Sequence, residues 1–212
     1  MTNTTETYNK MDEVILVAPR KQLFIDESLT FQGAISDPEK TAVIGKNLSE
    51  LYETMRRGDA EENFDFKQPI GYAIIRRGNE VYMYERLSGG GEKRLHNKVS
   101  IGVGGHMNAV EGADNFADTM FANIERELEE ELEITDPQFG INIFGFLNDD
   151  SDEVGRVHIG VLAMVAVEED SEVTVRETDQ LAGRWTTIEE LKGDDLYPRL
   201  ENWSKIVVDI LK

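Results

Sequence analysis

The sequence predicts an α/β protein in which helices pack against a sheet. Short apolar runs typical of strands alternate along the chain with segments whose apolar residues recur every three or four positions, as in amphipathic helices. The chain has 212 residues, of which 40% are hydrophobic, so it can bury the core of one domain, with or without an extension.

The amino-terminal part contains one predicted strand and one predicted helix. Residues 14–17 form a short apolar run and are predicted as a strand. Residues 41–57 are predicted as a helix, because their apolar residues, ending with Met55, share one stripe at helical spacing. The polar residues 58–65 are predicted to link this piece to the remainder of the chain.

A β-hairpin is predicted next. Residues 72–76 and 81–85 have the composition of strands and flank a Gly-Asn turn. Residues 88–91, Ser-Gly-Gly-Gly, are predicted as a flexible loop, and residues 100–105 as a strand that runs into a tight turn.

An acidic helix is predicted between residues 112 and 134. Asp114 or Asn115 can cap its first turn. One apolar stripe at helical spacing contains Ala117, Met120, Phe121, Ile124, Leu128 and Leu132. After it, residues 140–147 and 157–167 are predicted as strands, and residues 200–211 as a closing helix.

Three carboxylates lie beside the apolar stripe of the acidic helix. Glu127, Glu130 and Glu131 are three and four positions apart, so they share one arc of the helix surface. Such close like charges favour a cation among them, and a hard divalent ion such as Mg²⁺ takes carboxylate oxygens together with substrate phosphates. The alternative is a solvated acidic face in a protein whose net charge is −20.

This segment resembles the Nudix box, a pattern of Gly, five residues, Glu, seven residues, Arg-Glu, an aliphatic residue, any residue, Glu-Glu, any residue, Gly and an aliphatic residue. The positions that fall on this spacing are Gly112, Asp118, Arg126, Glu127, Leu128, Glu130, Glu131 and Ile134. Asp118 stands where the family has Glu, and Glu133 where it has Gly, whereas the Arg-Glu-Leu-x-Glu-Glu core is intact. The preceding glycine-rich loop and the amphipathic helix supply the context that such a motif needs.

The resemblance implies an α/β/α sandwich with a mixed sheet and the acidic catalytic helix on one face. It covers about residues 67–195, including a late strand, Trp and short helix at residues 183–191. We therefore assign residues 67–212 to a Nudix-like hydrolase domain and residues 1–66 to an amino-terminal extension packed on that core, either as an extra layer or as a dimer contact.

The resemblance also implies the chemistry, which is metal-dependent hydrolysis of a diphosphate linkage in a nucleoside diphosphate-X type of substrate. The implied catalytic residues are Arg126, Glu127, Glu130 and Glu131. The three glutamates would hold Mg²⁺ or Mn²⁺, and Arg126 would pair with one of the carboxylates of the box. The general base is either a glutamate of the box or one from a later loop, for which Glu153 and Glu177 are the candidates.

A glycine pair precedes the box at Gly104 and Gly105, several residues earlier than the usual family spacing. Either Gly112 is the glycine of the box, or the pair is its structural equivalent and the loop carries an insertion; the strand pattern at residues 100–105 favours the pair. The resemblance then implies a backbone carbonyl ligand to the metal, assigned to Gly105, and substrate contact at Gly104. The alternative is that these glycines only adopt backbone angles that other residues avoid.

Basic residues cluster just before the glycine pair. Arg76, Arg86 and Arg94 are candidates for binding the substrate, because a guanidinium group suits bidentate contact with phosphate. The alternative is that these side chains balance local acids on the surface of the hairpin.

Composition limits the partners and the compartment. A net charge of −20 disfavours nucleic acid polymers and anionic membranes as partners, although such acidity also fits a high-salt environment. No apolar run approaches the roughly 18–20 residues that cross a bilayer, and the amino terminus does not resemble a signal peptide, so a cytoplasmic protein is expected. The implied partner is a small-molecule diphosphate, and the sequence leaves a homodimer as an alternative to a monomer.

Residue counts bear on the alternative functions. The chain has no cysteine, which excludes a thiol nucleophile and disfavours isoprenoid diphosphate isomerase, a fold relative that commonly uses one. Its three histidines are scattered, so a metal site built from histidine is not expected. A non-catalytic Nudix-fold module for ligand binding or regulation stays open, because Asp118 and Glu133 depart from the box.

Overall fold

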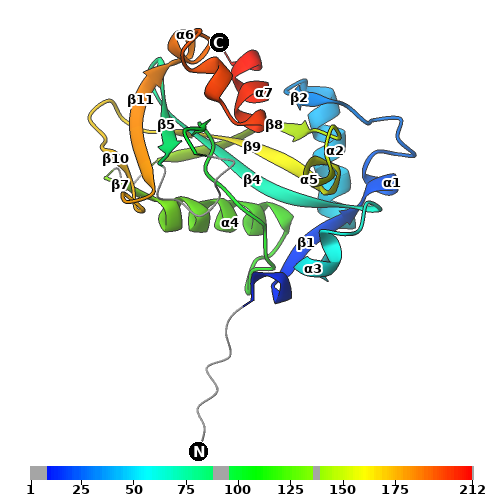
Figure 1. The fold of residues 1–212 in the computed structure, drawn as a ribbon. Coiled ribbons are helices and arrows are strands. Elements are labelled where there is room, and N and C mark those ends of the chain that lie inside the picture. The colour runs from blue at the N-terminus through cyan, green and yellow to red at the C-terminus, as the bar shows by residue number, and fades with distance from the viewer. Residues whose placement is uncertain (1–8, 88–95, 136–138, 212) are drawn as a thin grey trace, which may run out of the picture.

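A mixed sheet forms the middle layer of the computed structural model, which describes residues 9–87, 96–135 and 139–211 (Figure 1). The predicted glycine loop at residues 88–91 and Arg94 lie outside the described residues. In spatial order the strands of the main path are β11 (Leu181–Thr187), β5 (Glu80–Arg86), β4 (Phe66–Arg77), β9 (His158–Ala166), β8 (Gly140–Asn148) and β2 (Gly33–Ile35).

The two central strands are parallel. β4 and β9 pair from Gln68 opposite His158 to Arg76 opposite Ala166, while the other pairs along the main path are antiparallel. The burial of these two strands is nearly continuous, as expected for parallel strands covered on both faces. This pairing aligns residues that lie about ninety positions apart in the chain, and it determines one wall of the site described below.

Shorter strands join at the margins. β1 (Val14–Pro19) pairs with β3 (Glu53–Arg56) and with the start of β4, and β6 (Val99–Ser100) pairs with β5. β7 (Leu132–Ile134) and β10 (Val173–Val175) form a separate two-stranded sheet.

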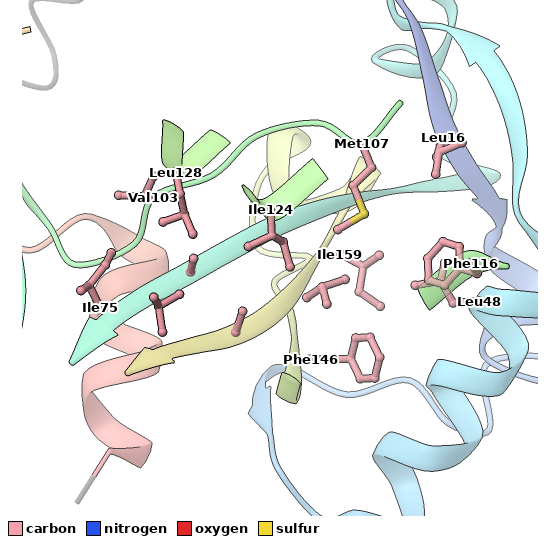
Figure 2. Packing of buried hydrophobic residues seen from close by; sticks show 14 of the residues in the cluster. Leu16, Leu48, Ile75, Val103, Met107, Phe116, Ile124, Leu128, Phe146 and Ile159 are labelled. Carbon is pink, nitrogen blue, oxygen red and sulfur yellow. The ribbon is translucent and has the colours of Figure 1, made fainter. Parts of the chain in front are cut away.

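Helices cover both faces of the sheet. α4 (Phe116–Glu131) and α2 (Pro38–Leu51) pack on one face, where Ile124 and Leu128 share a core with Leu48 (Figure 2). α6 (Ile188–Leu191) and α7 (Asn202–Ile210) pack on the other face through a second core, which includes Val207 and Val208 (Figure 1). The predicted α/β/α sandwich with a mixed sheet is confirmed. The remaining short helices are η1 (Lys10–Asp12), α1 (Arg20–Leu23), α3 (Arg57–Ala60), α5 (Glu153–Val157) and η3 (Tyr197–Arg199).

The amino-terminal residues share the main core with the remainder of the chain. Leu16 of β1 and Ile44 of α2 are buried in the same cluster as the acidic helix. The backbone N–H of Leu16 also donates to the carbonyl of Met107, 2.7 Å away, in the loop that precedes α4. Among the described residues, no helix combines the length and the apolar character that crossing a bilayer requires.

The prediction of one helix over residues 41–57 is wrong at its carboxyl end. α2 ends at Leu51, and the next residues form β3, in which Met55 lies opposite Ile15 of β1. The apolar spacing of this segment fits a helix as well as a strand, and pairing with β1 decides between them because it satisfies the backbone of both strands. The helix also begins earlier than predicted, at Pro38, because Asp37 caps it by accepting a hydrogen bond from the N–H of Lys40.

The acidic helix begins where its capping residue predicts. Asn115 Oδ1 accepts a hydrogen bond from the N–H of Asp118, 3.1 Å away, and the helix ends as Leu132 enters β7. We expect Asn115→Ala to lower the free energy of unfolding by about 1 kcal/mol, since it removes the acceptor for an otherwise unpaired N–H. Urea denaturation measures this loss. Asn115→Asp keeps an acceptor oxygen and should stay close to wild type; an equal loss in both variants would contradict the capping role.

Candidate active site

The acidic helix forms one wall of a polar cavity of about 630 Å³. The loop that follows β6 forms a second wall, and α5 and the start of β9 contribute a third. The lining residues are Lys10, Glu13, Arg57, Ile70, Gly104, Gly105, His106, Arg126, Glu127, Glu130, Glu131, Val154, His158 and Trp203. Six residues singled out from the sequence are thus gathered in one place: the arginine and three glutamates of the box, and the glycine pair.

The glycine pair lies between β4 and the acidic helix. A Cβ atom on Gly104 would lie 1.7 Å from the carbonyl oxygen of Gly71, and one on Gly105 would lie 2.6 Å from Glu127 Oε1. The N–H of Gly71 donates to the carbonyl of Gly105, 3.1 Å away, which holds the loop on β4. At Gly104 only glycine permits this approach, because a side chain would clash with backbone, whereas at Gly105 a side chain would displace the carboxylate of Glu127. Gly112 lies in a turn away from the cavity lining, with no atoms near its absent Cβ.

Arg126 ties the acidic helix to the loop. Its Nη2 atom is 2.8 Å from Glu127 Oε1 and donates to the carbonyl of His106, 3.0 Å away, while its Nη1 atom is 3.2 Å from Glu130 Oε2. Arg126 therefore orients two carboxylates and fixes the backbone just after the glycine pair.

Two asparagines reinforce this attachment. The N–H of Asn108 donates to Asn123 Oδ1 at 2.9 Å, and Asn123 Nδ2 donates to the carbonyl of Asn108 at 2.8 Å. Neither asparagine belongs to the sequence motif that predicted the site. The available signal was Asn123 itself, a buried polar residue beside the apolar stripe of the helix, where polar groups need partners.

The carboxylates are crowded and partly desolvated. Burial raises the pKa of Glu127, and the attraction of Arg126 only partly offsets this rise. Burial, together with the repulsion from Glu127, raises the pKa of Glu131 to about 7. Glu130 is more open, with 58% of its side chain exposed. Two of the three acids therefore lie in surroundings that disfavour an uncompensated negative charge.

The amino-terminal residues contribute charged groups to the cavity. Glu13 Oε1 accepts a hydrogen bond from Asn108 Nδ2 at 2.9 Å, and Glu13 Oε2 is 3.3 Å from Arg57 Nη1. Lys10 also lines the cavity. No local pattern indicated these three residues, because they reach the site only through the pairing of β1 with β3 and β4.

Two of the three histidines meet at the cavity wall, although their separation in the sequence predicted no histidine cluster. His106 Nε2 and His158 Nε2 are 3.2 Å apart. The reason is topological: β9 places His158 opposite Gln68 on β4, and an isolated bridge places His106 opposite Ile70 on the same strand. Burial lowers the pKa of both rings, that of His106 to about 3, so both imidazoles are neutral at pH 7.

The predicted basic residues are separated by the fold. Arg86 lines an adjoining cavity of about 560 Å³, where its Nε atom is 2.7 Å from Glu201 Oε1 and Gly104 belongs to both cavities. Arg76 instead folds over the β4–β5 turn, where its Nε donates to the carbonyl of Gly78 at 2.9 Å, and it lines neither cavity. The site prediction for Arg76 therefore has no support, because the sharp turn directs the side chain back to its own backbone.

Neither loop candidate for the general base lines the cavity. Glu153 is exposed at the start of α5. Glu177 is also exposed, but its charge contributes to the raised pKa of Glu131.

Known proteins that resemble this chain include a curated protein and a solved structure. No family model matches the chain. Protein YmaB of Bacillus subtilis (strain 168) is 54% identical over 204 residues, which cover 96% of this chain and 99% of YmaB. The crystal structure of Tm1382, a protein provisionally assigned to the Nudix hydrolases, is 26% identical and superposes with a TM-score of 0.74, covering 93% of this chain and 97% of Tm1382. The fold, the box and the likeness to Tm1382 agree that the chain, which is related to YmaB, belongs to the Nudix superfamily.

Proposed function

We propose that this protein is a metal-dependent pyrophosphohydrolase that cleaves the diphosphate linkage of a nucleoside diphosphate-X type of substrate. The observation that carries the proposal is the closeness of Glu127 to the Cα side of Gly105, where a Cβ atom would lie 2.6 Å from the carboxylate, so that the acidic helix and the glycine pair line one polar cavity. Membership of the Nudix superfamily supports a hydrolase of acid anhydrides, and the cavity is large enough for a substrate that bears two phosphates.

The donor set fits a hard divalent cation. Glu127, Glu130 and Glu131 supply oxygen atoms only, which suits Mg²⁺ or Mn²⁺. Burial and crowding raise the pKa of Glu127 and Glu131, and a bound cation offsets that electrostatic cost. When bound, such an ion polarises phosphoryl oxygens and makes a water molecule more acidic.

The other residues of the cavity bind and orient. Arg126 holds Glu127 and Glu130 in place through its two Nη atoms. Lys10 and Arg57 place positive charge beside the carboxylates. This charge reduces the repulsion that an anionic substrate would meet from a protein with net charge −20. We assign group X to the adjoining cavity, which Arg86 lines while paired with Glu201.

The domain assignment follows as part of this proposal. Residues 67–212 would form the hydrolase domain, and residues 1–66 an extension whose Lys10, Glu13 and Arg57 complete the cavity.

A panel of diphosphate compounds tests the proposal. Nucleoside diphosphate sugars, dinucleoside polyphosphates and nucleoside triphosphates are each incubated with Mg²⁺, with Mn²⁺ and with EDTA, and the products are separated by anion-exchange chromatography. We expect at least one compound to yield two phosphate-bearing fragments with metal and none with EDTA. Saturable binding of a panel member without any cleavage would instead indicate a ligand-binding module and would refute the proposed reaction.

A further inference from the structure

A second group of side chains that could ligate a metal includes His106 and His158 of the cavity wall, with Glu61 beside them. Glu61 follows α3, His106 follows the glycine pair, and His158 begins β9, yet their ligand atoms all lie within 4.8 Å of one another. His106 Nε2 is 3.7 Å from Glu61 Oε1, and His158 Nε2 is 4.0 Å from Glu61 Oε2. None of these three residues belongs to the Nudix box.

The spacing of the two ring nitrogens fits ligands of one ion. Zinc–nitrogen bonds are about 2.0–2.1 Å long, so two nitrogens at tetrahedral positions on one ion lie roughly 3.3 Å apart. His106 Nε2 and His158 Nε2 are 3.2 Å apart. Glu61 Oε1 is also 3.4 Å from Arg57 Nε, so the carboxylate would have to shift toward the two rings to complete a face of the same polyhedron. Its side chain is 25% exposed, which leaves room for that movement.

The tautomer of His158 is set by its outer nitrogen. His158 Nδ1 donates to the carbonyl of Val154, 2.6 Å away, so in the neutral ring the Nε2 atom carries a lone pair. That lone pair faces His106 and Glu61. Hydrogen bonding of the outer nitrogen to a backbone carbonyl is the usual way in which proteins orient a metal-ligating histidine.

A buried amide beside the cluster is not satisfied by the protein. Gln68 is fully buried and its Oε1 atom is 2.7 Å from His106 Nε2, whereas its Nε2 atom has no hydrogen-bond partner among the described residues. A buried amide with half of its hydrogen-bonding capacity unused is costly. The amide oxygen faces the cluster and accepts a hydrogen bond from His106 Nε2. An ion bound at His106 Nε2 would replace that proton, and the oxygen would then be placed to accept from a water molecule on the ion.

We propose that Glu61, His106 and His158 bind a divalent transition-metal ion of the Zn²⁺ class. Two imidazoles and one carboxylate suit Zn²⁺ better than Mg²⁺, which prefers oxygen ligands, so this site differs in kind from the all-oxygen site proposed on the acidic helix. The ion would tie α3 to β9 and to the loop after the glycine pair. Binding at this site does not depend on whether the protein cleaves diphosphates.

Histidine ring NMR tests the site directly. The full chain carries only three histidines, so ¹⁵N-labelled protein gives three ring systems that single His→Gln variants assign. The protein is used with Glu127→Gln, Glu130→Gln and Glu131→Gln in place, so that the acidic helix does not compete for the probe. On titration with Zn²⁺ we expect the Nε2 signals of His106 and His158 to shift together and to saturate at one equivalent, while His96 stays unchanged and Mg²⁺ moves none of them.

Competition with a chromophoric chelator gives the affinity. Loss of an outer partner of a metal-bound histidine costs about 10–100-fold, so loss of a ligand itself in His106→Gln or His158→Gln should weaken Zn²⁺ binding at least about 100-fold. His96→Gln is the matched control and should bind as the parent does. Because His158 is buried, near-UV circular dichroism checks the fold of each variant, and Glu61→Gln provides a variant at a more open position. Unshifted ring signals, or parental affinity in folded His106→Gln and Glu61→Gln, would overturn the proposal.

Discussion

Glu130→Gln should lower turnover at least 100-fold while the protein stays folded. The change keeps the size of the side chain and removes one of the three charges that we assign to the metal. Loss of an essential catalytic group typically costs about 10²–10⁴-fold in rate, which corresponds to at least about 2.7 kcal/mol in the activation free energy. Steady-state kinetics with the compound that the diphosphate panel identifies measures the effect.

Glu130 suits this test because little of the fold depends on it. Its side chain is 58% exposed, and its ion pair with Arg126 spans 3.2 Å at the surface. Exposed pairs of this kind contribute about 0–1 kcal/mol, so the midpoint of urea denaturation should barely move. A loss of activity without a loss of stability would therefore come from the chemistry.

Glu125→Gln is the matched control. Glu125 lies on the same helix, is exposed and does not line the cavity, so its replacement should leave turnover within about twofold of wild type. Equal activity in Glu125→Gln and Glu130→Gln would remove Glu130 from the catalytic group.

The part of the site that the sequence could predict is the part built from neighbours in the chain. Glu127, Glu130 and Glu131 share a helix face because of helical spacing alone, so the arc could be derived before any tertiary contact was known. The glycine pair was recognisable because a close backbone approach needs glycine whatever surrounds it. The α/β layering was also predictable, because the spacing of apolar residues and the capping of helices depend on residues that are close in the chain.

The other half of the cavity depends on pairings between distant strands. His106 and His158 meet because the parallel register of β4 and β9 sets His158 opposite Gln68, and no spacing in the sequence encodes that register. The same holds for Arg57, which reaches the site only because β3 pairs with β1 instead of continuing α2. Where the local spacing of apolar residues fits both a helix and a strand, pairing with a distant strand determines which one forms, and the spacing alone does not predict it.

Asp150→Asn should lower the free energy of unfolding by about 3 kcal/mol at pH 7. The reason is Lys67, which is fully buried on β4 and whose Nζ atom is 2.7 Å from Asp150 Oδ1. Removing one partner of a buried ion pair leaves the other charge buried without a partner, which lowers the free energy of unfolding by about 3–5 kcal/mol. The low end applies because Asp150 retains 24% exposure. Urea denaturation followed by tryptophan fluorescence measures the change.

Asp26→Asn is the control for charge removal alone. Asp26 pairs with Lys21 at 3.3 Å, but both side chains are more than 70% exposed, so the variant should stay within about 0.5 kcal/mol of wild type. Equal losses in Asp26→Asn and Asp150→Asn would show that burial of Lys67 is not the cause.

The pH dependence of stability distinguishes a buried charge without a partner from a simple packing defect. Burial lowers the pKa of Lys67 to about 8, although Asp150 opposes the shift; burial alone would raise the pKa of Asp150, but hydrogen bonds from Arg20 and Lys67 outweigh it and hold that pKa at about 2. Between about pH 8 and the unfolded value of 10.5, the folded state binds fewer protons at Lys67 than the unfolded state does, so this group adds stability as the pH rises. In Asp150→Asn the pKa of Lys67 should fall further, because the opposing carboxylate is gone.

The loss in unfolding free energy caused by Asp150→Asn should therefore be smaller at pH 9 than at pH 7. At pH 9 most of Lys67 is already neutral in the wild type, and a neutral amine gains less from the carboxylate. A packing defect would cost the same at both pH values, and that result would contradict the electrostatic account.

Lys67 Nζ also donates to the carbonyl of His158, 3.1 Å away, so the same variant should loosen the first residue of β9. Weaker Zn²⁺ binding in Asp150→Asn, with all three proposed ligands intact, would link this buried pair to the cavity wall that it supports.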